Sequence, residues 1–117
     1  FVCLGNICRS PTAEVVLRTK LQAAGLGDRF DIDSAGTYSG HVGLPPDARA
    51  QRHALRRGYD LSRLRARGVL PADFQRFDLI FAMDDDNRLN RNSLGSTVFF
   101  DVNLLEGLVF QYFQCFQ

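Results

Sequence analysis

Residues 3–10 constrain the fold of this chain more than any other segment of its sequence. They read Cys-Leu-Gly-Asn-Ile-Cys-Arg-Ser, follow the apolar and β-prone pair Phe1-Val2, and precede Pro11 and an amphipathic run. We call residues 3–10 the cysteine loop. Serine is favoured at a helix N-cap and proline at the first helical position, so a helix is expected to start at Ser10 and Pro11. Backbone amides between a strand and a helix start can converge on an anion, which the helix dipole also favours.

The residue types of the cysteine loop fit phosphate chemistry. Arg9 and the helix dipole are expected to hold Cys3 as a thiolate, which is the nucleophilic form. Arg9 also offers a planar pair of donors for two phosphoryl oxygens, and Ser10 can donate a hydrogen bond to the sulfur. Gly5 and Asn6 are expected at positive φ, where the loop turns its amides inward. The alternative is a buried structural cysteine, which the Gly-Asn and Ser-Pro pairs and the strand-then-helix context disfavour.

Apolar patterns along the rest of the chain predict alternating strands and helices. The expected helices begin at Pro11, at Pro46, at Pro71 and at residue 84, and the expected strands cover residues 30–34, 78–83 and 97–100. The first two helices are expected to end near Ala24 and Gly58, and the basic stretch 62–69 to be irregular. Alternation of this kind predicts an α/β fold with a parallel sheet and helices on both faces. Ligands of such folds bind at the carboxyl ends of strands, where the cysteine loop lies.

Length, charge and cysteine usage limit the class of protein. With 117 residues, of which 45% are hydrophobic, we expect one domain spanning residues 1–117. The net charge of +1 predicts no nucleic-acid partner, and no apolar run is long enough to predict a membrane partner. Three cysteines without a secretory signal predict free thiols and a cytoplasmic location. Because Phe1 stands inside an expected strand, we also expect native residues to precede it.

The sequence predicts no metal site and no cofactor. A zinc site that uses Cys3 and Cys8 needs two more ligands. The remaining candidates, Cys115, His41 and His53, stand at irregular spacing. His41 is instead expected to be a solvated loop residue, and His53 a surface or half-buried helix residue.

The cysteine loop resembles the phosphate-binding loop of the low-molecular-weight protein tyrosine phosphatases, and the chain is more similar to the bacterial type than to the animal type. The resemblance continues through residues 34–37, 41–49 and 77–84 and covers roughly residues 1–101. It implies the phosphotyrosine phosphatase I-like fold, which is a three-layer domain with a four-stranded parallel sheet. It also implies removal of phosphate through a cysteinyl-phosphate intermediate, without a metal or an organic cofactor.

The same resemblance implies roles for individual residues. Cys3 and Arg9 are the expected catalytic residues, and Ser10 and Ser34 are expected to support them. Ser34 is expected to share with Asn6 a hydrogen-bond network that holds the loop in shape. The expected phosphate-binding residues are Leu4, Gly5, Asn6, Ile7, Cys8 and Arg9. Cys8 is also expected to form a reversible disulfide with Cys3, which protects the nucleophile from further oxidation.

The general acid of the family has no counterpart in this sequence. An Asp-Pro-Tyr or Asp-Pro-Trp motif should follow the last strand, but Val-Asn-Leu-Leu-Glu-Gly follows Asp101 here. Either the protein has no acid loop, or the residues of that loop are missing from this sequence. We favour the second explanation, because otherwise an apolar segment from residue 108 onward would lack its connection to the sheet.

The sequence therefore predicts a protein tyrosine phosphatase that hydrolyses phosphotyrosine and aryl phosphate monoesters. Its expected partners are phosphotyrosine proteins or small aryl phosphates. One alternative is a catalytically weak module that binds phosphate or phosphotyrosine. A thiol-dependent arsenate reductase is a second alternative, which the absence of cysteine from residues 69–95 disfavours. The physiological substrate, the partner kinase and the oligomeric state do not follow from the sequence.

Overall fold

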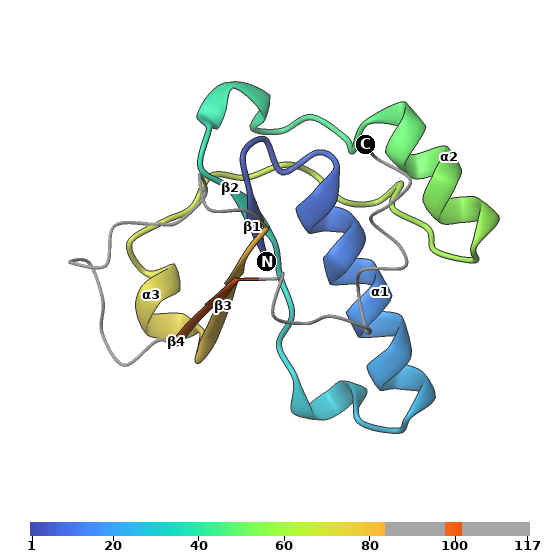
Figure 1. Cartoon of the computed structure of the whole chain (residues 1–117), viewed down its shortest axis with the longest axis horizontal. Coiled ribbons are helices and arrows are strands. Elements are labelled where there is room, and N and C mark those ends of the chain that lie inside the picture. The colour runs from blue at the N-terminus through green and yellow to red at the C-terminus, as the bar shows by residue number, and fades with distance from the viewer. Residues whose placement is uncertain (84–97, 102–117) are drawn as a thin grey trace.

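The chain alternates between strands and helices in a computed structural model that describes residues 1–83 and 98–101 (Figure 1). The elements are β1 (Val2–Cys3), α1 (Arg9–Ala23), β2 (Ala35–Gly36), α2 (Ala48–Arg56), α3 (Asp73–Arg76), β3 (Leu79–Ala82) and β4 (Val98–Asp101). Two short 3-10 helices, η1 (Gly27–Arg29) and η2 (Ser39–His41), lie between them. Within the described residues, no helix is long and apolar enough to cross a membrane.

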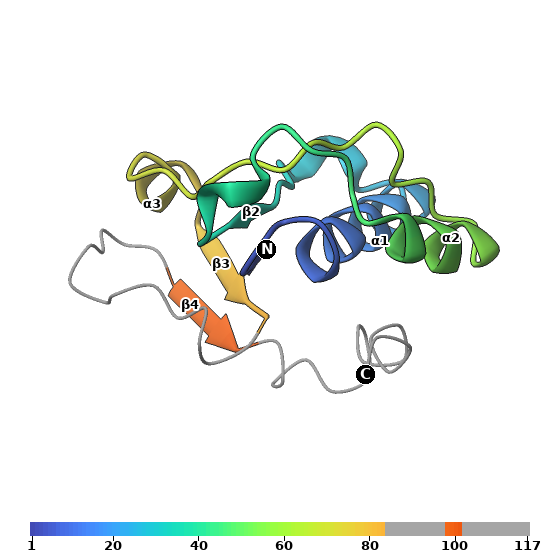
Figure 2. The same ribbon diagram turned by 90° about the horizontal axis from the view of Figure 1, so that it is seen from above.

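The strands form one parallel sheet of four strands in the order β2-β1-β3-β4 (Figure 2). The central strand β1 pairs with β2 through Val2↔Ala35 and with β3 through Val2↔Ala82. β3 and β4 pair along their whole lengths. The predicted four-stranded parallel sheet is therefore confirmed. Because the strands run in one direction, their carboxyl ends meet at one edge, and the cysteine loop leaves β1 at that edge.

Side chains of β1 pack against helices on both faces of the sheet. Cys3 packs with Ala13 of α1 and with Met83, whereas its neighbour Val2 packs with Phe74 of α3. Successive side chains of a strand point to opposite faces of the sheet. α1 and α3 therefore cover opposite faces, as the predicted arrangement of helices on both faces requires.

A separate apolar cluster holds α2 against α1. Val16 of α1 packs with Ala50 and Ala54 of α2, and with Tyr59 and Leu61 from the loop that follows α2. Figures 1 and 2 both show the two helices side by side. The two alanines are spaced one helical turn apart and lie on one face of α2, where small side chains allow close packing.

The predicted strand over residues 30–34 is wrong. β2 begins only at Ala35. The carbonyl of Ile32 accepts from Arg18 Nη2 at 2.8 Å and not from a neighbouring strand. The carbonyl of Asp33 accepts from the backbone nitrogen of Phe1, and the amide of Ala35 donates to the carbonyl of Phe1, both at 3.0 Å, so the bonds between the two segments reach back only to Asp33.

The prolines mark the starts of α2 and α3 only approximately. α2 begins at Ala48 behind Asp47, whose carboxylate accepts from the amides of Arg49 and Ala50. Asp47 therefore defines the start of this helix, because its side chain supplies the N-cap. The stretch 62–69 is irregular as predicted. The helix predicted from residue 84 and the segment from residue 108 lie outside the described residues.

Candidate active site

The cysteine loop arches from the carboxyl end of β1 to the start of α1 (Figure 1). Cys3 is the last residue of β1, and Arg9 is the first residue of α1. The predicted N-cap at Ser10 is wrong, because Cys8 holds that position and Ser10 and Pro11 lie in the first turn. Proline is tolerated there, since the first amides of a helix have no intrahelical partner. The Ser10 hydroxyl bonds inside the loop instead of capping the helix.

Cys3 lies at the floor of the loop, with two hydrogen-bonding groups at its sulfur. Sγ is 3.0 Å from Ser10 Oγ and 3.3 Å from the backbone nitrogen of Asn6. Cys3 is only 3% exposed and Ser10 is completely buried. Donors directed at a sulfur atom stabilise it in the thiolate form, both before it attacks and after it leaves.

Several carbonyl groups of the loop accept from residues outside it, and those of Cys3, Leu4 and Ile7 accept from other segments of the chain. The carbonyls of Cys3 and Leu4 accept from the amides of Thr37 and Tyr38 at 3.0 and 2.8 Å, and the carbonyl of Ile7 accepts from the N-cap residue of α2 at 2.7 Å. In a planar trans peptide the N–H points opposite to the C=O. The amide that follows each of these carbonyls therefore turns toward the interior of the loop. Inward amides at a helix start form an anion-binding cradle.

Asn6 holds the loop in its turned conformation. Its φ is 53°, and it is the only non-glycine residue with a positive φ in the part of the chain that the structure describes. Its Nδ2 donates to Ser10 Oγ at 2.8 Å and to Ser34 Oγ at 2.9 Å. Its Oδ1 accepts from the amide of Arg67 at 3.0 Å. The structure thus contains the predicted positive φ at Asn6 and the predicted bond between Asn6 and Ser34.

Gly5 permits a close contact and does not adopt the predicted positive φ. A Cβ at this position would lie 2.8 Å from Cδ2 of His41, which is closer than a carbon atom can pack. A Cβ at Gly36 would likewise lie 2.8 Å from the carbonyl oxygen of Leu4. His41 is therefore a half-buried neighbour of the loop and not the predicted solvated residue. Its ring also meets that of Tyr38 edge to face, with a centroid distance of 5.5 Å.

Glu14 supports the loop through its bond to Ser34, although it was not among the predicted site residues. This carboxylate is 3% exposed. Oε1 accepts from Ser34 Oγ at 2.8 Å, and Oε2 pairs with Arg18 at 3.0 Å. Burial raises the pKa of Glu14, and the bonds from Ser34 and Arg18 partly offset that effect. Glu14 stands three residues before Leu17 and seven before Leu21, so all three lie on one face of the helix. A charged residue on this apolar face is the sequence signal that could have indicated its role.

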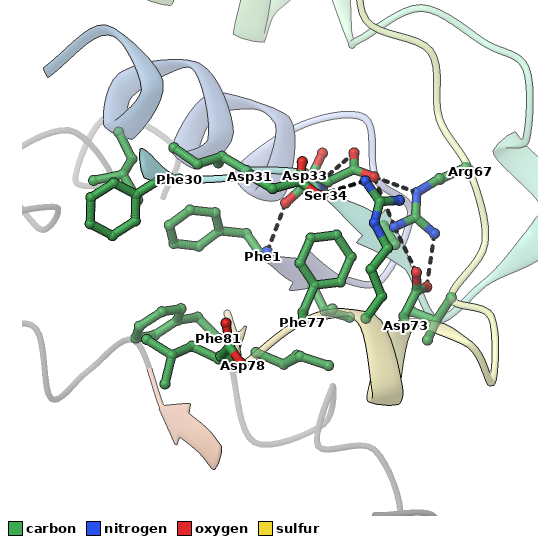
Figure 3. Close-up of a pocket in the computed structure, with 18 of the residues that line it drawn as sticks. Phe1, Phe30, Asp31, Asp33, Ser34, Arg67, Asp73, Phe77, Asp78 and Phe81 are labelled. Atoms are coloured by element: carbon green, nitrogen blue, oxygen red, sulfur yellow. Dashed lines mark hydrogen bonds and ion pairs between the residues drawn. The ribbon is translucent and has the colours of Figure 1, made fainter. Parts of the chain in front are cut away.

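Arg67 is a second supporting residue, and no sequence pattern marked it. Its guanidinium lies between Asp33 and Asp73, with ion-pair distances of 3.0 and 2.8 Å (Figure 3). Burial opposes ionisation of Asp73, but bonds from Arg67 and from the amide of Leu70 lower the pKa of Asp73 overall. The ion pairs fix the backbone of Arg67, whose amide holds the side chain of Asn6.

The two thiols of the loop differ in their surroundings. Cys3 and Cys8 are both free, and Cys8 is half-buried. Burial raises the pKa of the Cys8 thiol, as do the negative charges of Asp47 and Cys3, while Arg9 acts in the opposite direction. Cys8 therefore remains a neutral thiol at neutral pH.

The other residues that the sequence offered as candidates fall outside this arrangement. His53 lies in α2 and is half-buried. Within residues 1–83 and 98–101, no three His, Cys, Asp or Glu side chains are grouped so that they could hold a metal ion. The segment after Asp101, where a general acid was expected, lies outside the described residues.

A cavity of about 410 Å³ opens at the other end of the strands, where Phe1 precedes β1 and Leu79 begins β3. Phe1, Phe30, Phe77 and Phe81 contribute to its largely apolar wall (Figure 3). Arg67 and its two aspartates form a polar edge of the cavity. Among the described residues, no cysteine lines this cavity, so its chemistry differs from that of the cysteine loop.

Known proteins match this chain in sequence and in structure. A model of the family "Low molecular weight phosphotyrosine protein phosphatase" matches residues 1–107. A protein of that name from Schizosaccharomyces pombe is 52% identical over 93 residues, which are 79% of this chain and 59% of the yeast protein. The chain therefore spans less than two thirds of the length of that relative.

Two solved structures share the fold. A protein tyrosine phosphatase from Entamoeba histolytica superimposes with a TM-score of 0.80 at 40% identity, covering 87% of this chain and 67% of that one. A Drosophila arginine phosphatase superimposes with a TM-score of 0.81 at 34% identity, covering 89% and 69%. The resemblance in the cysteine loop thus extends over most of the chain, which belongs to the low molecular weight phosphotyrosine protein phosphatase family.

Proposed function

We propose that this protein is a protein tyrosine phosphatase that hydrolyses phosphotyrosine and aryl phosphate monoesters. One observation carries the proposal: Sγ of Cys3 lies 3.0 Å from Ser10 Oγ and 3.3 Å from the amide nitrogen of Asn6, at the floor of a loop whose amides turn inward. A nucleophile in an anion cradle is the arrangement that phosphoryl transfer requires. Family membership supports the same reaction.

The reaction follows from the positions of these groups. The Cys3 thiolate attacks phosphorus, an S–P bond forms, and the P–O bond to the phenol breaks with its electron pair on the leaving oxygen. Arg9 and the loop amides hold the remaining phosphoryl oxygens, whose charge is largest in the transition state. Water then cleaves the S–P bond, which releases phosphate and returns the thiolate. Ser10 stabilises that thiolate as the leaving group.

The leaving phenolate needs a proton if its pKa is high. General acid catalysis is worth roughly 10²–10⁴-fold. Without an acid, p-nitrophenyl phosphate should react far faster than phosphotyrosine, whose phenol has a pKa of about 10. With an acid, the two substrates should differ little. Measuring both substrates on one preparation of defined mass therefore tests whether a general acid is present.

The physiological substrate belongs to the same proposal. Phosphotyrosine proteins or small aryl phosphates are the proposed partners, supported by the family to which the chain belongs. The structural similarity to a protein described as an arginine phosphatase makes phosphoarginine the second substrate to test. A cytoplasmic location is also proposed, supported by two free thiols among the described residues.

The wild-type protein and Cys3→Ser should be compared in the same assays. Wild type should hydrolyse p-nitrophenyl phosphate and a phosphotyrosine peptide, whereas Cys3→Ser should show no turnover because a neutral hydroxyl is a poor nucleophile. Both should bind tungstate, since the loop amides and Arg9 remain. Tungstate binding by an inactive wild type would favour the weak binding module. Turnover of phosphoarginine alone would replace the proposed substrate, and turnover by Cys3→Ser would exclude Cys3 as the nucleophile.

A further inference from the structure

A continuous chain of buried hydrogen bonds connects the sulfur of Cys3 to a carboxylate. From Cys3 Sγ it runs to Ser10 Oγ at 3.0 Å, and Ser10 Oγ accepts from Asn6 Nδ2 at 2.8 Å. Asn6 Nδ2 also donates to Ser34 Oγ at 2.9 Å, and Ser34 Oγ donates to Glu14 Oε1 at 2.8 Å. Every member is at most 6% exposed. Water does not compete for these protons, so the partners within the chain determine the direction of each bond.

The direction of these hydrogen bonds is set at Glu14, the end of the hydrogen-bond series that is farthest from the sulfur. A carboxylate carries no proton, so the Ser34 hydroxyl must donate to Glu14. Ser34 Oγ can then accept from the side-chain amide of Asn6. Arg67 contributes to the same orientation, because its backbone N–H donates to Asn6 Oδ1 at 3.0 Å. Both Nδ2 protons of Asn6 therefore point at serine oxygens.

The same assignment of donors and acceptors places the hydroxyl proton of Ser10 at the sulfur of Cys3. Ser10 Oγ accepts from Asn6, so the hydroxyl proton of Ser10 must be donated to another atom. Two acceptors are available, Cys3 Sγ at 3.0 Å and the carbonyl oxygen of Ala35 at 3.5 Å. The longer contact lies at the outer limit for an O–H donor, so the proton is directed at the sulfur.

Only a carboxylate at position 14 satisfies both of its neighbours. Oε1 accepts from Ser34 and Oε2 accepts from Arg18 Nη2 at 3.0 Å. An amide would place N–H groups against one of these two donors. If the amide faced Ser34, the Ser34 proton would turn toward Asn6 and oppose the orientation of its side chain.

We infer that Glu14 is a positioning residue that keeps the Ser10 hydroxyl directed at the sulfur of Cys3. The inference rests on the proposed function of Cys3 as the nucleophile. Glu14 does not touch the substrate and acts only through Ser34, Asn6 and Ser10.

A direct charge effect of Glu14 would have the opposite sign. A nearby carboxylate disfavours a thiolate, so neutralising it should make the thiolate easier to form. The other charged side chains around Glu14 are Arg18 and Asp33. Loss of the hydrogen-bond direction should instead make the thiolate harder to form. The sign of the change therefore separates the two effects.

The first test measures alkylation of Cys3 by iodoacetamide across pH, with the labelled peptide identified by mass spectrometry. Glu14→Gln should move the midpoint of the Cys3 profile to higher pH by about 0.5–1 unit, which is roughly a three- to tenfold loss of thiolate below the midpoint. The matched control is Asp47→Asn, which removes another carboxylate near the loop and keeps an N-cap at α2. That control should move the midpoint to lower pH or leave it unchanged.

The second test restores the direction of the hydrogen bonds. In Glu14→Gln with Arg18→Met, the amide nitrogen can take the side vacated by Arg18, so that Oε1 again accepts from Ser34. This double variant should return the midpoint to within about 0.3 unit of wild type. A charge effect predicts no such return, because it depends on charge and not on which atom accepts. The double variant contains no buried charge at this position. Its alkylation profile can therefore still be measured if Glu14→Gln alone does not fold.

The outcomes separate this inference from the proposed function. Thermal unfolding establishes which variants are folded, and alkylation does not depend on turnover. A midpoint for Glu14→Gln that is unchanged or lower, or a double variant as impaired as Glu14→Gln, overturns the role of Glu14. Wild type that fails to hydrolyse phosphate esters overturns the proposed function, whatever the alkylation profiles show.

Discussion

The floor and the rim of the cysteine loop are built on different physical principles. The floor consists of Cys3, Asn6 and Ser10, which are buried and bonded to one another. We define the rim as Leu4 and Tyr38, which are 59 and 52% exposed. The two regions meet where Leu4 follows Cys3 in the chain, and within the rim the backbone of Tyr38 donates to the carbonyl of Leu4 at 2.8 Å.

Because of this difference, turnover and substrate specificity should respond to substitutions in different parts of the loop. Each polar atom of the floor has a determined partner, so a substitution there disturbs several bonds at once. The rim presents apolar surface to solvent, and a substitution there removes contacts without leaving a buried polar group unpaired. Changes at the floor should therefore alter turnover, and changes at the rim should alter substrate binding.

The largest effect is expected from Arg9→Lys. Lysine keeps the charge but cannot reproduce two parallel donors to the phosphoryl oxygens. We expect kcat/KM for p-nitrophenyl phosphate to fall by roughly 10²–10³-fold, in the range of a lost transition-state donor. Tungstate affinity should fall as well, and isothermal titration measures it. Wild-type kinetics in this variant would show that the charge alone is sufficient.

Asn6→Gly tests the floor without adding backbone strain. Glycine accepts the φ of 53°, so the substitution removes only the bonds to Ser10, Ser34 and Arg67. The free energy of unfolding should fall by about 1–3 kcal/mol, with a loss of activity. Asn6→Ala is the matched variant and should lose about 1 kcal/mol more, because it adds the left-handed strain. Equal unfolding free energies for Asn6→Gly and wild type in urea titration would contradict the supporting role of this side chain.

Cys8 should decide whether oxidation of the floor is reversible. Peroxide converts the Cys3 thiolate to a sulfenic acid, and the Cys8 sulfur then displaces water to form a disulfide that a thiol reductant cleaves. Wild type should regain activity after reduction, and Cys8→Ser should not. The raised pKa of Cys8 keeps it protonated at neutral pH, so its attack should become faster as the pH rises toward alkaline values. Equal recovery of both proteins would count against this role.

The smallest effect is expected at the rim, from Tyr38→Ala. An exposed aromatic contact with a substrate ring is worth about 0.5–1.5 kcal/mol. KM for an aryl phosphate should therefore rise by roughly two- to tenfold while kcat stays close to wild type, as expected when uniform binding is lost. A large loss of kcat would show that Tyr38 also holds the floor, through its ring contact with His41.

The floor could be predicted from sequence to the extent that its residues are adjacent in the chain. The proposed nucleophile, the arginine and the turned asparagine stand within a single short segment, which the start of a helix follows. The start of that helix was misplaced at Ser10, because the pattern for an N-cap cannot show that the hydroxyl is bonded to Cys3 and Asn6 instead. The prediction for Gly5 failed for a similar reason, since its close neighbour His41 lies far away in the sequence.

The supporting residues were missed because they depend on the folded chain. Glu14 carried a weak signal as a charge on an apolar helix face. Arg67 stands in an irregular basic stretch, where nothing local separates it from Arg63 or Arg65. The alternation of strands and helices predicted the sheet, yet the strand expected over residues 30–34 begins only at Ala35, and the carbonyl of Ile32 accepts from the side chain of Arg18 instead of a neighbouring strand.

The most direct test is to trap the covalent intermediate. The protein should be mixed with a rapidly hydrolysed aryl phosphate, quenched in the steady state and digested for mass spectrometry. We expect one phosphoryl group on the peptide that contains Cys3, and none on the same peptide from Cys3→Ser. Hydrolysis by a protein that carries no phosphoryl group on Cys3, or that carries it on Cys8, would contradict the assignment of Cys3 as the nucleophile at the floor of the loop.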